Sequence, residues 1–425
     1  MTNPALWYAA LVAASLSLVS CGGAATNYGP PSTTSTRVLA SQSAASPTAS
    51  PSLVVVNGET DTIPRAPGIG AGNSPGLMAI SPNRSTVLAF DSVSNSVEVI
   101  NTQRESTTGA IQLAGPTTSM VALATGSGYA AVPAAPLIGS PPGALEVMNL
   151  TAGGITATLS VPSARTVVAS PDGTHLLVFS NDSDVVTVVY PLLVNVGTPV
   201  STTVPGFDRP TYGVFSADGS VAYILNCGPE CASGTASASV QTLDMTTLAV
   251  GSQIAVDGAT IGWLSGSTLY VAGNSPTNNL CTGQTTAATT CGRLDLMDLG
   301  SMTVTGSVVI TDGYHDRIDM SVNGQLFIGS YTCSDIGNVN NPQGEVRGCL
   351  SIYNTNNGTV VIPPDNGDVT GLQSFTTRNV EYVAEGGNLR VYDTNIDSLL
   401  INSYIETGTI TITGKIIDVK AIDFF

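Results

Sequence analysis

Charge of either sign is scarce in this sequence, and positive charge is the scarcest. Only 10% of the 425 residues are charged, 13 Lys and Arg stand against 30 Asp and Glu, and the formal net charge is −17. Affinity for nucleic acids comes largely from cationic groups that displace counterions. We therefore expect no nucleic-acid partner.

Helical patterns are also missing, because no stretch places Ala, Glu, Lys and Leu at helical spacing. The chain instead has 45 glycines and 25 prolines, which favour many short strands joined by turns. P-loop, Rossmann and Ser/His/Asp hydrolase signatures are not found in the strand–turn–helix context that they require. The composition therefore predicts an all-β chain with no nucleotide-binding or serine-hydrolase motif.

No hydrophobic run reaches the length of a membrane-spanning helix. The longest, Ala5–Val19, is too short to span and ends at Leu18-Val19-Ser20-Cys21-Gly22. These residues resemble the lipobox of bacterial lipoproteins, although residues 1–10 lack the Lys or Arg typical of such signals. The resemblance implies a signal peptide over residues 1–20, cleavage before Cys21 and acylation of that cysteine. The alternative is an ordinary secretory signal with an incidental cysteine.

Glycine at position 22, where an aspartate would be expected for retention in the inner membrane, implies the outer membrane by the same resemblance. We expect a lipid-anchored domain in the bacterial cell envelope, facing either the periplasm or the cell surface. Residues 21–52 are rich in Gly, Ala, Ser, Thr and Pro, with Arg37 as their only charge. Such a composition predicts a flexible tether, which leaves residues 53–425 for the folded domain.

What the chain does contain is a repeated strand–turn–strand unit. Its clearest copy, Val167–Val189, reads as a strand, a Ser170-Pro171-Asp172-Gly173 turn, a second strand, a polar turn and a third strand. Similar turns recur at residues 216–219 and 81–84. Equivalent positions are roughly 40–57 residues apart, the spacing of β-propeller blades. We predict a β-propeller of seven complete four-stranded repeats.

Two further strands are left over at the ends of the domain, at Leu53–Gly58 and Ile416–Asp423. Pairing of these two strands would close the ring and remove two exposed sheet edges. They either complete one of the seven repeats or form an eighth, composite blade. We favour the composite blade.

The turn motifs and the recurring Val-x-Val-x-Asn/Asp-Thr third strands resemble the YVTN-repeat or lactonase-like propellers of bacterial envelopes. The resemblance covers nearly all of residues 53–425 and implies a fold rather than an activity, since the matching residues are turn and strand chemistry. Some lactonase propellers use acidic residues and histidines, in part around Ca²⁺. No complete set of that kind aligns here. With two tryptophans, the chain also lacks the docking motifs of quinoprotein propellers, so no quinone is expected.

Six cysteines remain after Cys21, and an even number in an exported chain argues for disulfides. Neighbouring cysteines fall between the second and third strands of the fourth, fifth and sixth repeats. We predict the pairs Cys227–Cys231, Cys281–Cys291 and Cys333–Cys349. A zinc site is disfavoured because it needs four clustered ligands and the chain has only His175 and His315 to supplement the thiolates.

The braced loops and the loops between blades emerge on the same face of a propeller, which makes that face the candidate recognition surface. The ligand-binding candidates lie in its inter-blade loops: Asp208, Arg209, Asp257, Tyr314, His315, Arg317 and Asp368. Within the densest polar run, His315 beside Asp316 could act as a general base and Arg317 could hold an oxyanion. The structural alternative is an Asp316–Arg317 salt bridge with His315 packed beside it.

We expect no cofactor and no metal. Calcium is the alternative, at Asp182 with Asp184 or at Asp365 with Asp368, although neither pair has the spacing of an EF-hand loop. The leading functional hypothesis is a binding module for a protein, a glycan or a small ligand. A hydrolase of lactones or similar esters, with His315, Asp316 and Arg317 as catalytic candidates, is the alternative, and a structural envelope scaffold is the third.

Overall fold

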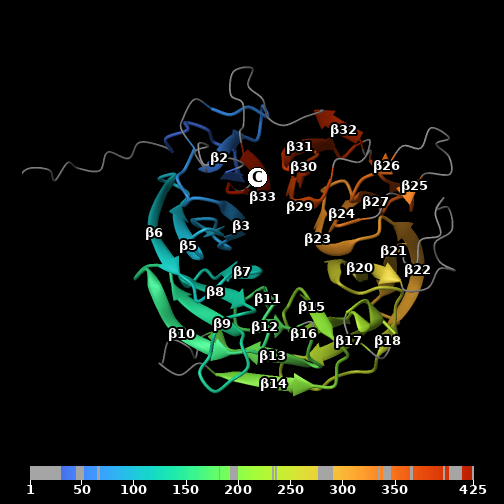
Figure 1. The fold of residues 1–425 in the computed structure, drawn as a ribbon. Helices are drawn as coiled ribbons and strands as arrows, with labels where there is room; N and C mark the ends of the chain where they lie inside the picture. The colour runs from blue at the N-terminus through green and yellow to red at the C-terminus, as the bar shows by residue number, and fades with distance from the viewer. Residues whose placement is uncertain are drawn as a thin grey trace, which may run out of the picture.

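The protein is an all-β propeller whose eight blades are arranged in a ring (Figure 1). The computed structural model describes residues 30–44, 52–64, 68–180, 182–191, 200–231, 234, 237–275, 291–333, 336–337, 346–363, 367–395, 398–401 and 414–423. The predicted signal peptide, Cys21, Cys281 and Asp365 lie outside these residues. No helix in the described part of the chain is long and apolar enough to cross a bilayer.

Seven blades are four-stranded antiparallel sheets. The strands of each blade follow one another in chain order from the innermost to the outermost. The first three are β3 (Pro75–Ile80), β4 (Thr86–Asp91), β5 (Ser96–Asn101) and β6 (Ser106–Gln112); β7 (Ser119–Ala122), β8 (Ser127–Val132), β9 (Ala144–Asn149) and β10 (Gly154–Ser160); and β11 (Thr166–Ala169), β12 (Leu176–Phe179), β13 (Val185–Val189) and β14 (Ser201–Pro205).

The next two blades are β15 (Pro210–Phe215), β16 (Val221–Asn226), β17 (Ser239–Asp244) and β18 (Ile254–Ala255), and β19 (Ile261–Ser265), β20 (Thr268–Ser275), β21 (Cys291–Asp298) and β22 (Thr303–Ile310). The last two are β23 (Tyr314–Met320), β24 (Gln325–Tyr331), β27 (Leu350–Asn354) and β28 (Val360–Val361), and β29 (Val369–Phe375), β30 (Val380–Glu385), β31 (Asn388–Asp393) and β32 (Ser398–Ile401). A small hairpin, β25 (Ile336–Gly337) with β26 (Val346–Arg347), lies between β24 and β27, and the 3-10 helix η1 (Gly228–Glu230) follows β16. All seven predicted repeats are confirmed.

The eighth blade is composite and closes the ring. The C-terminal strand β33 (Gly414–Ala421) pairs with β1 (Arg37–Ala44), which pairs in turn with β2 (Ser52–Asn57). An isolated bridge between Leu53 and Ile69 adds one more rung to this sheet. The favoured composite blade is therefore confirmed, with β33 beside both β3 and β29, its neighbours on either side (Figure 1).

The expected tether over residues 21–52 is wrong for residues 37–44, because these residues form β1, the middle strand of the composite blade. Val38, Leu39 and Ala40 are fully buried there. The Ser/Thr-rich composition around this short apolar run indicated a tether. The run forms a strand through its pairing with β2 and with β33 from the far end of the chain. The propeller begins at Arg37 rather than at residue 53.

The repeated turns hold the two innermost strands of the third and fourth blades in register. In the third blade, Ser170 Oγ donates to Asp172 Oδ1 (2.6 Å), the Thr174 amide donates to the same oxygen (3.0 Å), and Gly173 supplies the positive φ of 70°. The fourth blade repeats this arrangement around Asp218. These turns lie at the end of the ring opposite to the disulfides.

Candidate functional site

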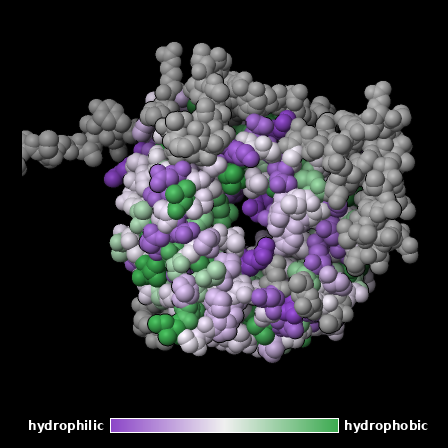
Figure 2. All heavy atoms as spheres, in the orientation of Figure 1, coloured by the Kyte–Doolittle hydropathy of each residue, from purple (hydrophilic) through white to green (hydrophobic). Residues whose placement is uncertain are grey.

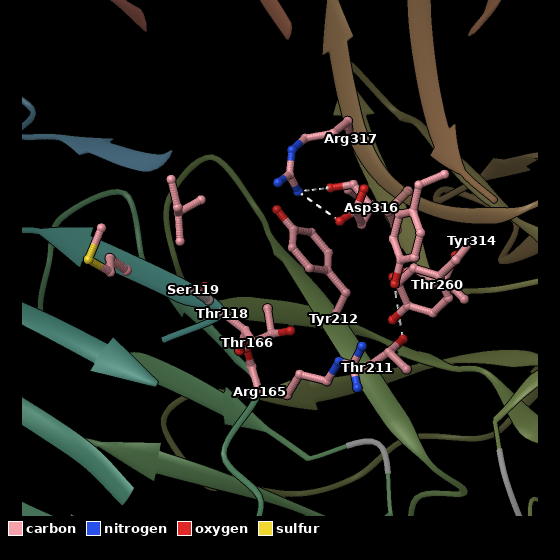
Figure 3. Close-up of a pocket in the computed structure, with 14 residues that line it drawn as sticks. Thr118, Ser119, Arg165, Thr166, Thr211, Tyr212, Thr260, Tyr314, Asp316 and Arg317 are labelled. Carbon is pink, nitrogen blue, oxygen red and sulfur yellow. Dashed lines mark hydrogen bonds and ion pairs between the residues drawn. The ribbon is translucent and has the colours of Figure 1, made fainter. Parts of the chain in front are cut away.

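The candidate site is a cavity of about 350 Å³ at the propeller axis. Figure 2 shows the ring hollowed at its centre and bordered by hydrophilic side chains. The residues labelled in Figure 3 come from the beginnings of five innermost strands or directly precede them: Thr118, Ser119, Arg165, Thr166, Thr211, Tyr212, Thr260, Tyr314, Asp316 and Arg317.

This end of the axis belongs to the disulfide-bearing face. Cys227 donates its amide to the Arg209 carbonyl (3.1 Å), directly before β15 begins, and the Ser330 hydroxyl bridges the carbonyls of Asp312 and Cys349. Disulfides Cys227–Cys231 and Cys333–Cys349 are present as predicted. Cys291 is also disulfide-bonded, and its expected partner Cys281 lies outside the described residues. The braced loops and the cavity therefore share one face.

Hydroxyl groups join the innermost strands of successive blades around the cavity. Thr118 Oγ1 donates to the Arg165 carbonyl (2.5 Å), and Thr260 Oγ1 donates to the His315 carbonyl (2.8 Å). Thr211 Oγ1 donates to the carbonyl of Ala259 (3.2 Å) in the same manner. Each bond ties the start of one inner strand to the next blade, so the cavity wall is fixed by the ring itself. None of these threonines was among the predicted site residues, although a Thr at the start of successive inner strands is a visible signal in the sequence.

Bulges aim adjacent side chains into the cavity. The pairing of β23 with β24 shifts between His315 and Arg317, which leaves Asp316 as an extra residue. The same shift between Pro210 and Tyr212 leaves Thr211 extra on β15. A bulge breaks the strict alternation of a strand and re-aims its side chains. For this reason Asp316 and Arg317 both line the cavity although they are neighbours in sequence.

The cavity contains an ion pair between Asp316 and Arg317, in which one carboxylate oxygen has no hydrogen-bond partner among the described residues. Arg317 Nη1 lies 3.0 Å from Asp316 Oδ2, and both side chains are about 30% exposed. Arg317 Nε donates to the Thr370 carbonyl (2.7 Å) in the next blade, which fixes the guanidinium. Asp316 Oδ1 is buried without a hydrogen-bond partner among the described residues. Burial raises the pKa of Asp316, with Arg317 and Arg165 acting in the opposite direction.

A second cation and three tyrosines complete the wall. The Arg165 guanidinium lies 5.8 Å from the centroid of the Tyr314 ring, which is itself 5.3 Å from the ring of Tyr331. The Tyr212 hydroxyl points toward Arg317 (Figure 3). Burial raises the pKa of both Tyr212 and Tyr331, so each keeps its phenolic proton as a hydrogen-bond donor at neutral pH. Two guanidiniums and several hydroxyls thus face one carboxylate.

Of the sequence-predicted residues, Tyr314, Asp316 and Arg317 line the cavity and His315 does not. The His315 side chain is fully buried, and its Nε2 donates to the Thr311 carbonyl (2.8 Å). Burial lowers the pKa of His315 to about 4. The imidazole is therefore a neutral core group rather than a general base in the cavity, as in the structural alternative.

The other four candidates lie on the same face but outside the cavity lining, each bonded elsewhere. Arg209 pairs with Asp184 (3.7 Å), and Asp257 pairs with Arg293 (2.9 Å). Asp368 Oδ1 accepts the Thr332 amide (2.8 Å), and the Asp208 amide donates to Asn226 Oδ1 (3.3 Å). The structure instead brings in Arg165, which the sequence analysis did not single out. Its only signal is an arginine directly before an innermost strand in a chain with few cations.

The calcium alternatives receive no support from the described residues. Asp182 Oδ1 accepts the Ser180 hydroxyl and Asp184 pairs with Arg209, so the two carboxylates serve different partners. Asp365 lies outside the described residues. In the part of the chain that the structure describes, no three or more His, Cys, Asp or Glu side chains form a group that could hold a metal ion.

Comparison with known proteins identifies the fold and nothing finer. No protein-family model and no curated protein matches the sequence. Among solved structures, the chain is similar to the dihydro-heme d1 dehydrogenase NirN in complex with DHE (TM-score 0.62, 12% identity, 91% of this chain and 75% of that one). It is also similar to the periplasmic gluconolactonase PpgL of Pseudomonas aeruginosa (TM-score 0.53, 13% identity, 91% and 98%). A third similar structure is the computationally designed Ika8 protein (TM-score 0.55, 12% identity, 84% and 96%). At these identities the likeness shows a β-propeller.

Proposed function

We propose that this protein is a propeller lipoprotein of the bacterial cell envelope that binds a small organic anion in its axial cavity. The supporting observation is the excess of cations in the cavity: Arg165 and Arg317 face it with Asp316 as the only acid, in a chain of net charge −17. An arginine fork binds carboxylates through paired N–H groups, and the fixed Arg317 loses little freedom when it does so. The tyrosine and threonine hydroxyls would complete the contacts with the ligand.

The lipobox-like Leu18-Val19-Ser20-Cys21 supports export and anchoring at Cys21. The disulfides support the same compartment, because such bonds persist in oxidising environments. An acylated domain of this kind would hold its cavity close to a membrane surface. Substitution Cys21→Ser tests this part: we expect loss of processing and release from the membrane fraction, and unchanged membrane association would contradict it.

Calorimetry on anions and their uncharged counterparts tests the binding role: glucuronate with glucose, benzoate with benzyl alcohol, and hexanoate with hexanol. We expect at least one anion to bind and its counterpart to bind at least tenfold more weakly. The double substitution Arg165→Gln, Arg317→Gln should abolish the difference, whereas Arg104→Gln, an exposed arginine on the first blade, should leave it unchanged. Absence of binding for every anion would favour the scaffold hypothesis.

Lactone or ester hydrolysis is the second candidate function, and Asp316 is the observation that favours it. A carboxyl group with a raised pKa and one buried, unpaired oxygen, beside an arginine, can position water against a carbonyl group that the arginine polarises. The likeness to a gluconolactonase is compatible with this chemistry but lies at the level of the fold. Turnover of a lactone and ester panel, lost in Asp316→Asn and retained in His315→Gln, would establish it. A result in which EDTA abolishes turnover would instead require a metal.

A further inference from the structure

A second cavity, of about 670 Å³, lies at the opposite end of the innermost strands of the third, fourth and fifth blades. Its rim is formed by residues of the turns that follow these strands, among them Pro171, Ala217 and Gly266. Apart from Tyr212 and the Trp263 indole N–H, every side chain that lines it is nonpolar. The cavity is therefore suited to a hydrocarbon surface.

The two cavities share a wall. Tyr212 lines both, so it lies at the boundary between them. Along β11 the wall passes from Thr166 in the first cavity to Val168 in the second, and along β19 it passes from Ile261 to Trp263. Residues two apart in a strand lie on the same face about 7 Å apart. One continuous axial wall thus changes from hydroxyl and guanidinium groups at the disulfide face to aliphatic and aromatic groups at the other face.

We infer that the ligand is an anionic amphiphile, with its carboxylate at Arg165 and Arg317 and its alkyl chain passing Tyr212 into the cavity at Trp263. This inference rests on the proposed anion-binding function and specifies the ligand class. A purely hydrophilic anion would leave the nonpolar cavity in contact with water. An uncharged hydrocarbon would form no ion pair with the two guanidiniums that line the first cavity. A molecule with a carboxylate and an alkyl chain would contact the arginines of the first cavity and the nonpolar side chains of the second.

Trp263 gives a direct readout. The chain has two tryptophans, and Trp7 lies in the predicted signal peptide, so Trp263 is the only tryptophan of the mature protein. Butyrate, hexanoate, octanoate and decanoate are titrated below their micelle concentrations, with decanol as the uncharged control. We expect affinity to rise about fourfold per added methylene once the chain passes Tyr212. Trp263 fluorescence should change with octanoate and decanoate but not with butyrate.

Two substitutions place a carboxylate in the nonpolar cavity: Val168→Asp in its wall and Ala217→Asp at its exposed rim, where folding is least at risk. Each substitution should lower the affinity for decanoate at least tenfold and leave the affinity for butyrate unchanged. The matched control is Val322→Asp, since Val322 is 56% exposed in the corresponding turn of the sixth blade and lines neither cavity.

Three results would overturn the inference. Equal affinity for butyrate and decanoate, still dependent on Arg165 and Arg317, would refute the amphiphile and leave the anion-binding function standing. If decanol binds as tightly as decanoate, the nonpolar cavity binds the alkyl chain and the arginines contribute nothing to the affinity. Binding of no carboxylate at all would refute both proposals.

Discussion

Arg37 and Asp423 join the two ends of the propeller. Arg37 Nη2 lies 2.7 Å from Asp423 Oδ1, across 386 residues of sequence, and the Arg37 amide and Nε donate to Asp423 Oδ2. The same guanidinium pairs with Glu105 (3.0 Å) and donates to the Thr102 carbonyl of the first blade. One buried arginine thus connects the N-terminal strand, the C-terminal segment and the first blade.

Arg37→Ala should therefore destabilise ring closure. It leaves the Glu105 carboxylate, whose side chain is 3% exposed, without its cation, and removal of one partner of a buried pair costs about 3–5 kcal/mol. We expect a fall of this size in the free energy of unfolding, measured in urea. The control is Arg104→Ala, one residue from Glu105 but exposed, which should change stability by less than about 0.5 kcal/mol. Equal effects of the two substitutions would refute the proposed role of Arg37.

Glu230 should make the protein less stable as the pH rises. Its Oε2 accepts the Asn274 amide (2.8 Å) in the next blade, its Oε1 is buried without a partner among the described residues, and burial raises the pKa of Glu230 from 4.5 to about 8. The folded protein then holds this proton more tightly than the unfolded chain does. The contribution to stability is complete below pH 4.5, declines up to about pH 8 and is lost above it.

Glu230→Gln should remove that decline, which is on the order of several kcal/mol. The measurement is urea unfolding from pH 4.5 to pH 9 for the wild type, for Glu230→Gln and for Glu59→Gln, an exposed control. Subtraction of the variant curve isolates the contribution of Glu230 from that of the net charge. Parallel curves for the wild type and Glu230→Gln would show that the carboxyl group titrates normally.

His315 should make the protein less stable as the pH falls, in the opposite direction to Glu230. The pKa of its buried imidazole falls from 6.5 to about 4, so below pH 6.5 the unfolded chain takes up a proton that the folded protein excludes. This contribution is complete above pH 6.5 and is lost as the pH falls to about 4. His315→Gln, which can still donate to the Thr311 carbonyl, should flatten stability over this range. His175→Gln, at the only other histidine of the chain, is the control. Retention of the acid-side slope in His315→Gln would contradict the assignment.

The sequence predicted the blades well because each repeat carries its own turn chemistry. Ser170, Asp172 and Gly173 form the turn that their spacing indicates, and the same holds around Asp218. The prediction failed at β1, whose residues become a strand only because β2 and β33 lie on either side of them. Local composition contains no information about a pairing that spans most of the chain.

The candidate site was predicted in part for a similar reason. The polar run after residue 313 was correctly placed on the disulfide face, but a strand directs alternate residues to opposite sides, so His315 enters the core. The bulge that directs both Asp316 and Arg317 to the axis depends on the pairing of β23 with β24. Arg165 reaches the cavity only through ring closure, three blades away in sequence from Arg317. Residues that meet at a propeller axis have no fixed spacing along the chain.

The disulfides should stabilise the loop face according to the lengths of the loops that they close. Cys333–Cys349 spans a separation of 16 residues and Cys227–Cys231 a separation of 4. In the chain-entropy model, closure of the longer loop contributes about 3 kcal/mol and that of the shorter about 2 kcal/mol. We expect Cys333→Ser, Cys349→Ser to lower the free energy of unfolding more than Cys227→Ser, Cys231→Ser, both measured in urea without reductant. The reverse order would show that packing of the loops, rather than closure of the chain, governs their stability. Wild-type protein unfolded in reductant should lose both contributions together with that of the Cys291 disulfide, and each double variant should lose correspondingly less.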